Sequence, residues 1–341
     1  MPQVPGIPGR VEGIDHLPRD LRFVATLGIF DGLHRGHAAV LRTLAETAER
    51  LRATATVITF EPHPEAVLRG TPPLLLCDPA ERLARLAATG GDLVVVQRFD
   101  RDFAAQSAEG FIDRLARGRD LAGLVMSPES AFGRDRQGTL DRIRALSGER
   151  GFVLSESPSL ELGGERVSST SIRLLIERGR LAEAVRSLGR RYAVIGEVVP
   201  GDRRGREMGY PTANLSFAEP VVLPPNGIYA TRVSWAGSDP LHPARTADGV
   251  ASLGVRPTFA SDGARLLEVH LFDFDEDLYG KRLRVEVIRR QRGERRFVSV
   301  GSLVRQMDRD AARARQILAA SAAETASHER PSRIAARSTD C

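Results

Sequence analysis

Lysine is almost absent from this sequence of 341 residues, which has 49 basic residues but only one lysine, Lys281. A P-loop requires a Gly-Lys-Ser/Thr sequence, and a protein kinase requires a lysine on an early strand. Lys281 is followed by Arg282 and lies late in the chain, so both ATP-binding architectures are excluded. Any chemistry on ATP must therefore depend on backbone amides, histidine and arginine.

Cysteines and long apolar runs are also scarce. Cys77 and Cys341 are far apart, which argues against a disulfide framework and a cysteine metal site and indicates a reducing compartment. The longest apolar runs, such as residues 93–96, have the length of a strand, whereas a membrane helix needs roughly 18 apolar residues. The first residues lack the basic and apolar regions of a signal peptide. We therefore expect a cytoplasmic protein with no membrane partner.

The net charge is +5 and the sequence pI is about 9.8, which raises the hypothesis of nucleic-acid binding. However, the arginines are scattered among 44 acidic residues and form no basic stripe. We therefore expect no nucleic-acid partner.

Residues 22–188 alternate between strand-like and helix-like segments. Such alternation predicts an α/β fold with a doubly wound, Rossmann-like parallel sheet, in which ligands bind at the carboxyl ends of the strands. Asp78, Pro79 and Glu81 have the order typical of a helix start. The five expected strands are 24–30, 54–60, 92–97, 122–127 and 152–157. The expected helices lie near 38–51, 107–117 and 139–149, and one more begins at Asp78.

From about residue 190, short alternating strands separated by Gly, Pro and Asp turns predict a small antiparallel β-barrel. The expected strands are 192–199, 227–235, 249–255, 266–274 and 282–290. A terminal helix is expected, with an apolar face formed by Val300, Leu303, Val304, Met307, Ala311 and Leu318. With the junction near 180–191, the predicted domains are 1–188 and 189–320, and residues 321–341 are expected to form a disordered tail.

The first polar motif, LGIFDGLHRGH, occupies residues 27–37. We expect the strand to end at Phe30, so that His34 and His37 share a face on the first turn of the next helix. The amides and dipole at a helix N-terminus attract phosphate, and Gly36 allows phosphate to approach the backbone. The pattern favours a nucleotide site over a zinc site, because no cysteine cluster supplies a third ligand.

This segment resembles the HxGH signature of nucleotidylyltransferases, in the form typical of the bacterial bifunctional riboflavin kinase/FAD synthetase family. Two further segments match that family. Pro62-His63-Pro64 resembles its flavin-side loop, although such a sequence alone is typical of a rigid turn. Residues 167–173 resemble its second phosphate motif, where the serine and threonine hydroxyls would also cap a helix.

For the first domain, the resemblance implies transfer of an adenylyl group from ATP to FMN, giving FAD and pyrophosphate. The FMN phosphate is already ionised, so the protein must position it and stabilise charge. The resemblance assigns His34 and His37 to the developing charge and Arg173 to the pyrophosphate. It implies ATP contacts from Gly28, Phe30, Asp31, Gly36, Ser168, Ser169 and Thr170, and flavin contacts from Pro62, His63, Pro64 and Glu129.

One segment departs from the family pattern. After the fourth strand the family has Gly-x-Asp/Asn-Phe-x-Phe-Gly, whereas residues 127–133 read Ser-Pro-Glu-Ser-Ala-Phe-Gly. Glu129 stands in the place of the shorter acidic or amide residue. The departure leaves open a riboflavin kinase whose adenylyltransferase domain has degenerated.

The second motif, GDRRGREMGYPTANL, occupies residues 201–215. Its glycines allow the backbone to wrap around phosphates, and we expect Gly201, Arg206 and Gly209 to contact ATP. Thr212 and Asn214 alternate on an extended segment, so their oxygens face one side and suit Mg2+. A flexible basic loop is the alternative reading. The Pro-Thr-Ala-Asn sequence resembles the riboflavin-kinase module, which implies that Thr212 and Asn214 bind ATP and the metal.

Later segments match the same module in order: 226–230, 253–259, 266–288, Arg292, Glu294, Phe297 and 303–310. Leu267, Val269 and Leu271 share one face of a strand, which leaves Glu268 on the other. The resemblance makes Glu268 the general base for the riboflavin 5′-hydroxyl as its oxygen attacks the γ-phosphorus of ATP. It also implies that Arg292 contacts the flavin.

The expected small-molecule partners are riboflavin, FMN, FAD and ATP, with Mg2+ as cofactor. Two other functions explain less of the sequence. A nucleotidylyltransferase for another phosphate substrate does not account for the kinase module. A flavin- or RNA-binding module without activity does not account for the Pro-Thr-Ala-Asn sequence, Glu268 and the HxGH motif together. Protein partners and oligomeric state are not predicted.

Overall fold

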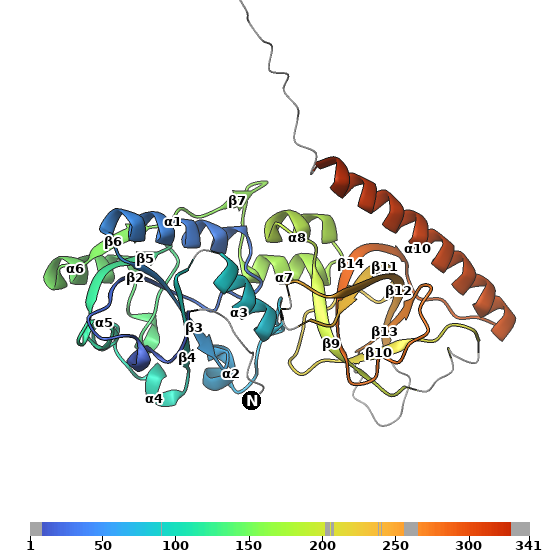
Figure 1. The fold of residues 1–341 in the computed structure, drawn as a ribbon, viewed down its shortest axis with the longest axis horizontal. Helices are drawn as coiled ribbons and strands as arrows, with labels where there is room; N and C mark the ends of the chain where they lie inside the picture. The colour runs from blue at the N-terminus through green and yellow to red at the C-terminus, as the bar shows by residue number, and fades with distance from the viewer. Residues whose placement is uncertain are drawn as a thin grey trace, which may run out of the picture. The chain divides into compact units, whose positions relative to one another are not determined.

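The computed structural model describes residues 9–89, 91–201, 205, 208–237, 239, 241–255 and 265–328, with side chains up to residue 323. The chain forms two compact units (Figure 1). Unit 1 comprises Met1–Ile195, Phe217–Pro225 and Ala236–Ala244, and unit 2 comprises Gly196–Ser216, Asn226–Trp235 and Arg245–Cys341.

Unit 1 contains the predicted parallel sheet, with six strands in the order β1-β4-β3-β2-β5-β6. From β2 the chain proceeds to β3 and β4 on one side and later to β5 and β6 on the other. The order therefore reverses at β2, the place where doubly wound sheets bind ligands. The strands are β1 (Arg10–Glu12), β2 (Arg22–Leu27), β3 (Thr54–Glu61), β4 (Leu93–Arg98), β5 (Asp120–Met126) and β6 (Val153–Glu156).

Helices cover both faces of this sheet, as Figure 1 shows. Leu44 and Leu86 pack in the core on one face, and Phe111 and Ile143 pack in the core on the other. The remaining elements of unit 1 are α1 (Arg35–Leu51), α2 (Pro64–Arg69), α3 (Pro79–Ala88), α4 (Arg101–Ala104), α5 (Ala108–Ala116), α6 (Leu140–Arg150), α7 (Ser169–Glu177), α8 (Leu181–Leu188), the 3-10 helices η1 (Ile14–His16) and η2 (Arg134–Arg136), and the hairpin β7 (Glu161–Leu162) and β8 (Glu165–Arg166).

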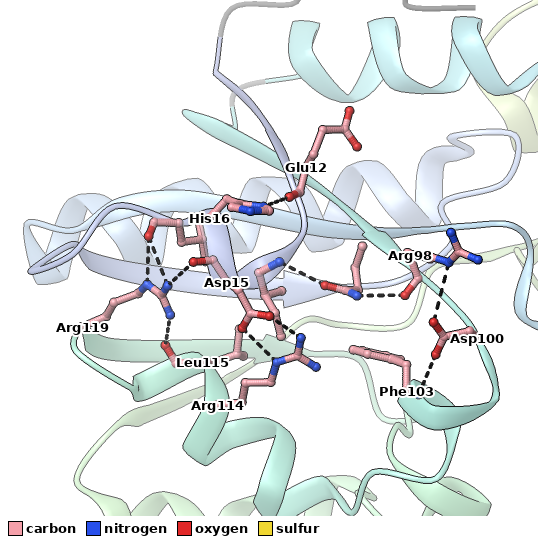
Figure 2. Close-up of polar contacts among 12 residues, drawn as sticks. Glu12, Asp15, His16, Arg98, Asp100, Phe103, Arg114, Leu115 and Arg119 are labelled. Atoms are coloured by element: carbon pink, nitrogen blue, oxygen red, sulfur yellow. Dashed lines mark hydrogen bonds and ion pairs between the residues drawn. The ribbon is translucent and has the colours of Figure 1, made fainter. Parts of the chain in front are cut away.

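Strand β1 and η1 were not predicted, because a three-residue strand and a single 3-10 turn carry no periodic signal. Tertiary contacts hold them in place (Figure 2). Arg114 of α5 donates to both carboxylate oxygens of Asp15 at 3.0 and 2.5 Å, and Arg119 donates to the Leu17 carbonyl. The Gln97 side chain accepts a hydrogen bond from the Ile14 amide at 3.0 Å.

Unit 2 is the predicted antiparallel barrel, closed in the order β10-β13-β12-β11-β14-β9. Leu267, Val269 and Leu271 alternate along β13 and are buried, as expected. The strands are β9 (Ala193–Val199), β10 (Ala213–Ser216), β11 (Gly227–Trp235), β12 (Arg245–Val255), β13 (Arg265–Leu271) and β14 (Arg282–Arg292).

The terminal helix α10 (Val300–His328) packs Ala314 and Leu318 against Ala230 and Phe272 of the barrel. On the expected apolar face, Leu318 is buried, whereas Val300 is 65% exposed. The helix also continues past residue 320 to His328, where the Ala-rich sequence has high helix propensity. Residues 329–341 of the expected tail lie outside the described residues.

Candidate functional site

The first candidate site begins where β2 ends. The strand stops at Leu27 rather than at Phe30, because Phe30 adopts a left-handed conformation with φ of 55°. Gly32 follows with φ of 80°. A left-handed conformation at a residue other than glycine costs on the order of 1 kcal/mol, so surrounding contacts must hold this turn.

His34 and His37 lie together, as predicted, with stacked rings whose centroids are 3.6 Å apart. His34 is the N-cap of α1 rather than a residue of the helix, and its Nδ1 accepts a hydrogen bond from the His37 amide at 3.2 Å. Since Nδ1 accepts, the neutral His34 ring carries its proton on Nε2. The Nδ1 of His37 is buried and has no hydrogen-bond partner among the described residues.

Both histidines are neutral at physiological pH. Burial, together with the nearby Arg190 and Arg173, lowers the pKa of His34 to about 4. Burial, His34 and Arg190 lower the pKa of His37 well below its usual value. Two neutral imidazoles among guanidinium groups offer N–H donors to an anion without requiring protonation.

The second phosphate motif lies directly against the first. Ser168 caps α7 through reciprocal hydrogen bonds with Ser171, which confirms the capping reading for this residue. Ser169 donates from its hydroxyl to the Asp31 carbonyl at 2.9 Å. A Cβ at Gly36 would lie 3.2 Å from the Val167 carbonyl, so glycine allows this close approach. Thr170 is exposed.

Asp31 and Arg173 form an ion pair at 2.6 Å. The buried Asp31 carboxylate also accepts from the Leu76 amide at 3.0 Å, and Arg173 donates from Nε to the Leu74 carbonyl at 2.7 Å. Arg173 is therefore oriented within the site and partly neutralised by Asp31. Its assignment to the pyrophosphate remains a prediction.

The Pro62-His63-Pro64 segment forms a rigid turn that starts α2. His63 is the N-cap, with its Nδ1 accepting from the Glu65 amide at 3.1 Å, and Pro64 occupies the first helical position. Burial lowers the pKa of His63, while Asp31 opposes this effect. His63 thus interacts with the charges of the first motif, and the contact of this segment with flavin remains a prediction.

Glu129, at the departure from the family pattern, forms an ion pair with Arg166 at 3.1 Å and accepts from Ser159 at 2.6 Å. Burial raises the pKa of Glu129, but hydrogen bonds from Ser159, its own backbone and Arg166 lower it below its usual value overall. The sequence analysis missed Arg166, although it immediately precedes the second phosphate motif. It also missed Arg190, which lies in the expected domain junction.

The second candidate site lies in unit 2, where two predicted residues face each other. Asn214 on β10 is the register partner of Glu268 on β13, and Ser252 on β12 pairs with Glu268 from the other side. Directly opposed residues on antiparallel strands have neighbouring side chains on one face. The barrel therefore places the predicted metal ligand beside the predicted base.

The Oδ1 of Asn214 is buried and has no hydrogen-bond partner within the part of the chain that the structure describes. Gly201 packs so closely that a Cβ there would lie 2.1 Å from the Asn214 amide nitrogen. Gly209 has φ of 82°, and Arg206 lies outside the described residues. No cluster of three or more His, Cys, Asp or Glu ligands occurs among the described residues, so a metal here would depend on Thr212, Asn214, water and phosphate oxygens.

All three nitrogens of the Arg292 guanidinium donate hydrogen bonds to protein groups. Its Nε and Nη2 donate to Asp310 of α10 at 3.0 and 2.6 Å, and its Nη1 donates to the Gly293 carbonyl at 2.9 Å. In this structure Arg292 ties β14 to α10, and its contact with flavin remains a prediction.

Two residues missed by the sequence analysis hold the Pro-Thr-Ala-Asn segment. His270 donates from Nδ1 to the Pro211 carbonyl at 2.8 Å, and Tyr210 donates from its hydroxyl to Asp308 of α10. Burial, Asp308 and Asp310 raise the pKa of Tyr210 to about 12, so the phenol remains a hydrogen-bond donor. Only the fold brings these residues together, because they are up to 98 positions apart.

Comparison with known proteins gives matches for both units. The FAD synthetase family model matches residues 18–171, and the riboflavin kinase family model matches residues 188–318. The Bifunctional riboflavin kinase/FMN adenylyltransferase of Escherichia coli K12 is 38% identical over 86% of this chain and 92% of its own length. A protein of the same name from Pseudomonas fluorescens is 38% identical over 92% of this chain and 98% of its own length. Another, from Bacillus subtilis, is 33% identical over 84% of this chain and 90% of its own length.

Among solved structures, a chain titled as a macrolide-efflux protein from Streptococcus pneumoniae is 29% identical, with a TM-score of 0.76. The likeness covers 89% of this chain and 97% of that one. In the described part of the present chain, no helix is long and apolar enough to cross a membrane.

Proposed function

The chain belongs to the family of bifunctional riboflavin kinase/FMN adenylyltransferases, and from this premise we propose how its residues divide the two reactions. It phosphorylates riboflavin to FMN and transfers an adenylyl group from ATP to FMN, giving FAD and pyrophosphate. We assign adenylyl transfer to residues 1–188 and phosphorylation to residues 189–320. A kinase with a degenerate first domain is not favoured, because the FAD synthetase model matches residues 18–171.

In adenylyl transfer, the phosphate of FMN attacks the α-phosphorus of ATP, and the bond to pyrophosphate breaks. The nucleophile is already an anion, so no general base is needed. His34 donates from Nε2 to the charge that develops on the α-phosphate, and His37 acts beside it. Support comes from the tautomer that the His37 amide imposes on His34 and from the unpartnered Nδ1 of His37.

The charged groups around these histidines set where the substrates lie. Arg173 binds the pyrophosphate end of ATP, while Asp31 orients its guanidinium through the 2.6 Å ion pair. The backbone near Gly28, Phe30 and Gly36 and the hydroxyls of Ser169 and Thr170 line the nucleotide. Pro62, His63, Pro64 and Glu129 lie on the flavin side. Because Arg166 neutralises Glu129, this carboxylate adds little repulsion toward the FMN phosphate.

In the kinase reaction, Glu268 takes the proton of the riboflavin 5′-hydroxyl as that oxygen attacks the γ-phosphorus of ATP. A neutral alcohol requires such a base. Thr212 and Asn214 would hold Mg2+, which supplies charge to the phosphates of ATP. The unpartnered, buried Oδ1 of Asn214 fits this role. Gly201 and Gly209 let the loop approach the triphosphate, and the ATP-dependent chemistry supports a cytoplasmic location.

The observation that carries this assignment is the register of the barrel. Asn214 and Glu268 are 54 positions apart in sequence and directly opposite each other on adjacent strands. Metal ligand and base must both reach the γ-phosphate and the attacking hydroxyl, which requires this proximity.

The test is Glu268→Gln, which keeps the shape of the side chain and removes its basicity. We expect FMN formation to fall by a factor of about 100 or more, while conversion of FMN to FAD stays within about twofold of the original rate. The matched control is Glu197→Gln, at an exposed glutamate on β9 of the same barrel. Normal FMN formation in Glu268→Gln, or loss of both activities in a folded protein, would contradict the assignment.

A further inference from the structure

Arg82, on α3, links the ends of two strands of unit 1. Its Nη1 donates to the Ile29 carbonyl at 2.8 Å and to the Thr59 hydroxyl at 3.4 Å. Its Nη2 donates to the Glu61 carboxylate at 2.8 Å. Ile29 follows the end of β2, whereas Thr59 and Glu61 end β3, so one guanidinium joins the carboxyl ends of neighbouring strands.

Both strand ends lead directly into the adenylyl-transfer site. Ile29 precedes Phe30, whose left-handed conformation starts the turn to His34, and the Phe30 ring packs edge-on against His37 with 5.2 Å between centroids. Glu61 precedes Pro62 and His63. A shift of the Ile29 carbonyl therefore moves the residue that supports the His37 ring.

A charged residue at this position is unusual, because Arg82 is buried, with only 6% of its surface exposed. Burying a guanidinium is unfavourable unless its donors are paired, and an apolar side chain would fill the same space without that penalty. The planar fork of arginine directs two separate nitrogens at oxygens of the two segments, whereas lysine has a single nitrogen without this fixed geometry. The hydrogen bonds also restrain the strained turn at Phe30.

We propose that Arg82 is a positioning residue for adenylyl transfer, which fixes the turn carrying His34 and His37 relative to the segment carrying His63. It contacts no substrate and acts through Ile29, Thr59 and Glu61. This inference rests on the proposed role of the two histidines.

Two variants test the proposal. Arg82→Met removes all three hydrogen bonds, and Arg82→Lys keeps the charge but loses the fork. We expect kcat for FMN adenylylation, per folded molecule, to fall by on the order of 10-fold to 100-fold in Arg82→Met and less in Arg82→Lys, since small misplacements of catalytic groups have effects of this size. The KM for ATP should change less than kcat. Riboflavin phosphorylation in the same molecules should stay within about twofold, which serves as an internal control for folding.

The matched control is Arg22→Met. Arg22 of β2 also joins two strands of this sheet, because it pairs with Asp120 of β5, but it does so at their amino ends, away from the site. Its Nε also donates to the carbonyl of Leu51, at the end of α1, at 3.2 Å. We expect its adenylylation rate per folded molecule to match that of the unmodified protein.

A second measurement distinguishes positioning from a general loss of stability. In Arg82→Lys a looser turn admits water to His34, so its pKa should rise from about 4 toward 6.5 in a proton NMR titration. Arg22→Met should leave that titration unchanged. If Arg82→Met does not fold, Arg82→Lys decides the question.

The proposal is overturned if Arg82→Lys adenylylates FMN at the original rate with an unchanged His34 titration. It is also overturned if the activity lost equals the fraction of molecules unfolded. A separate result would show that the proposed role of His34 in adenylyl transfer is wrong. In that case His34→Asn would adenylylate FMN at the original rate, whatever the Arg82 variants do.

Discussion

At the scale of single residues, His34 illustrates how one side chain serves structure and chemistry together. Its Nδ1 caps α1, which fixes the tautomer and leaves Nε2–H for a ligand. The same burial that positions the ring keeps it neutral. The HxGH spacing predicted that His34 and His37 share a face, but not that one of them caps the helix.

This burial makes the stability of unit 1 depend on pH. The pKa of His34 is about 4 in the folded protein and ordinarily 6.5, so below pH 6.5 the unfolded chain binds a proton that the folded chain does not. Stability is therefore lost as the pH falls from 6.5 to 4. Between pH 7 and pH 5 we expect the original protein to lose about 2 kcal/mol more than His34→Asn, in which Asn retains a helix cap.

The measurement is urea unfolding followed by circular dichroism at pH 7 and pH 5. Glu129→Gln, at an ionisable residue elsewhere in unit 1, serves as a comparison that should retain the histidine-dependent loss. Equal pH dependence in the original protein and His34→Asn would refute the prediction.

At the scale of elements, a buried ion pair joins α10 to the barrel. Asp310 accepts hydrogen bonds from Arg292 and, at 2.9 Å, from Gln306. The side chains of Arg292 and Asp310 are both largely buried. The apolar pattern predicted helix α10, but it could not reveal that a charged residue lies in its contact surface. The partner that makes this burial tolerable is 18 positions away, on β14.

Breaking this pair should weaken unit 2 substantially. Asp310→Ala leaves the largely buried Arg292 guanidinium without a carboxylate partner, which costs about 3–5 kcal/mol. Trp235, the single tryptophan of the chain, is buried in unit 2, so its fluorescence during urea unfolding reports this loss. Asp273→Ala removes an exposed ion pair between the barrel and Arg315 of α10 and should shift the midpoint little. Equal shifts in the two variants would contradict the prediction.

At the scale of the whole molecule, each unit has its own core and its own candidate site. We therefore expect the two reactions to communicate through free FMN. We expect a mixture of Glu268→Gln and His34→Asn proteins to convert riboflavin to FAD, although each variant alone fails.

Chromatography of riboflavin, FMN and FAD over time checks this prediction. FMN should accumulate before FAD, and FAD formation should accelerate with protein concentration, since FMN must leave one molecule and bind another. The unmixed variants at the same total concentration are the controls. A mixture that forms FMN but no FAD would refute independent sites.

Sequence alone determined the two architectures, the alternation of the barrel strands and the positions of the phosphate motifs, because each depends on local spacing or on residues adjacent in the chain. Only the tertiary structure decided that β2 ends at Leu27, that Arg173 pairs with Asp31 and that Arg292 is held by Asp310. Ion pairs, burial and cross-strand register depend on residues far apart in sequence, and only folding brings them within hydrogen-bond distance.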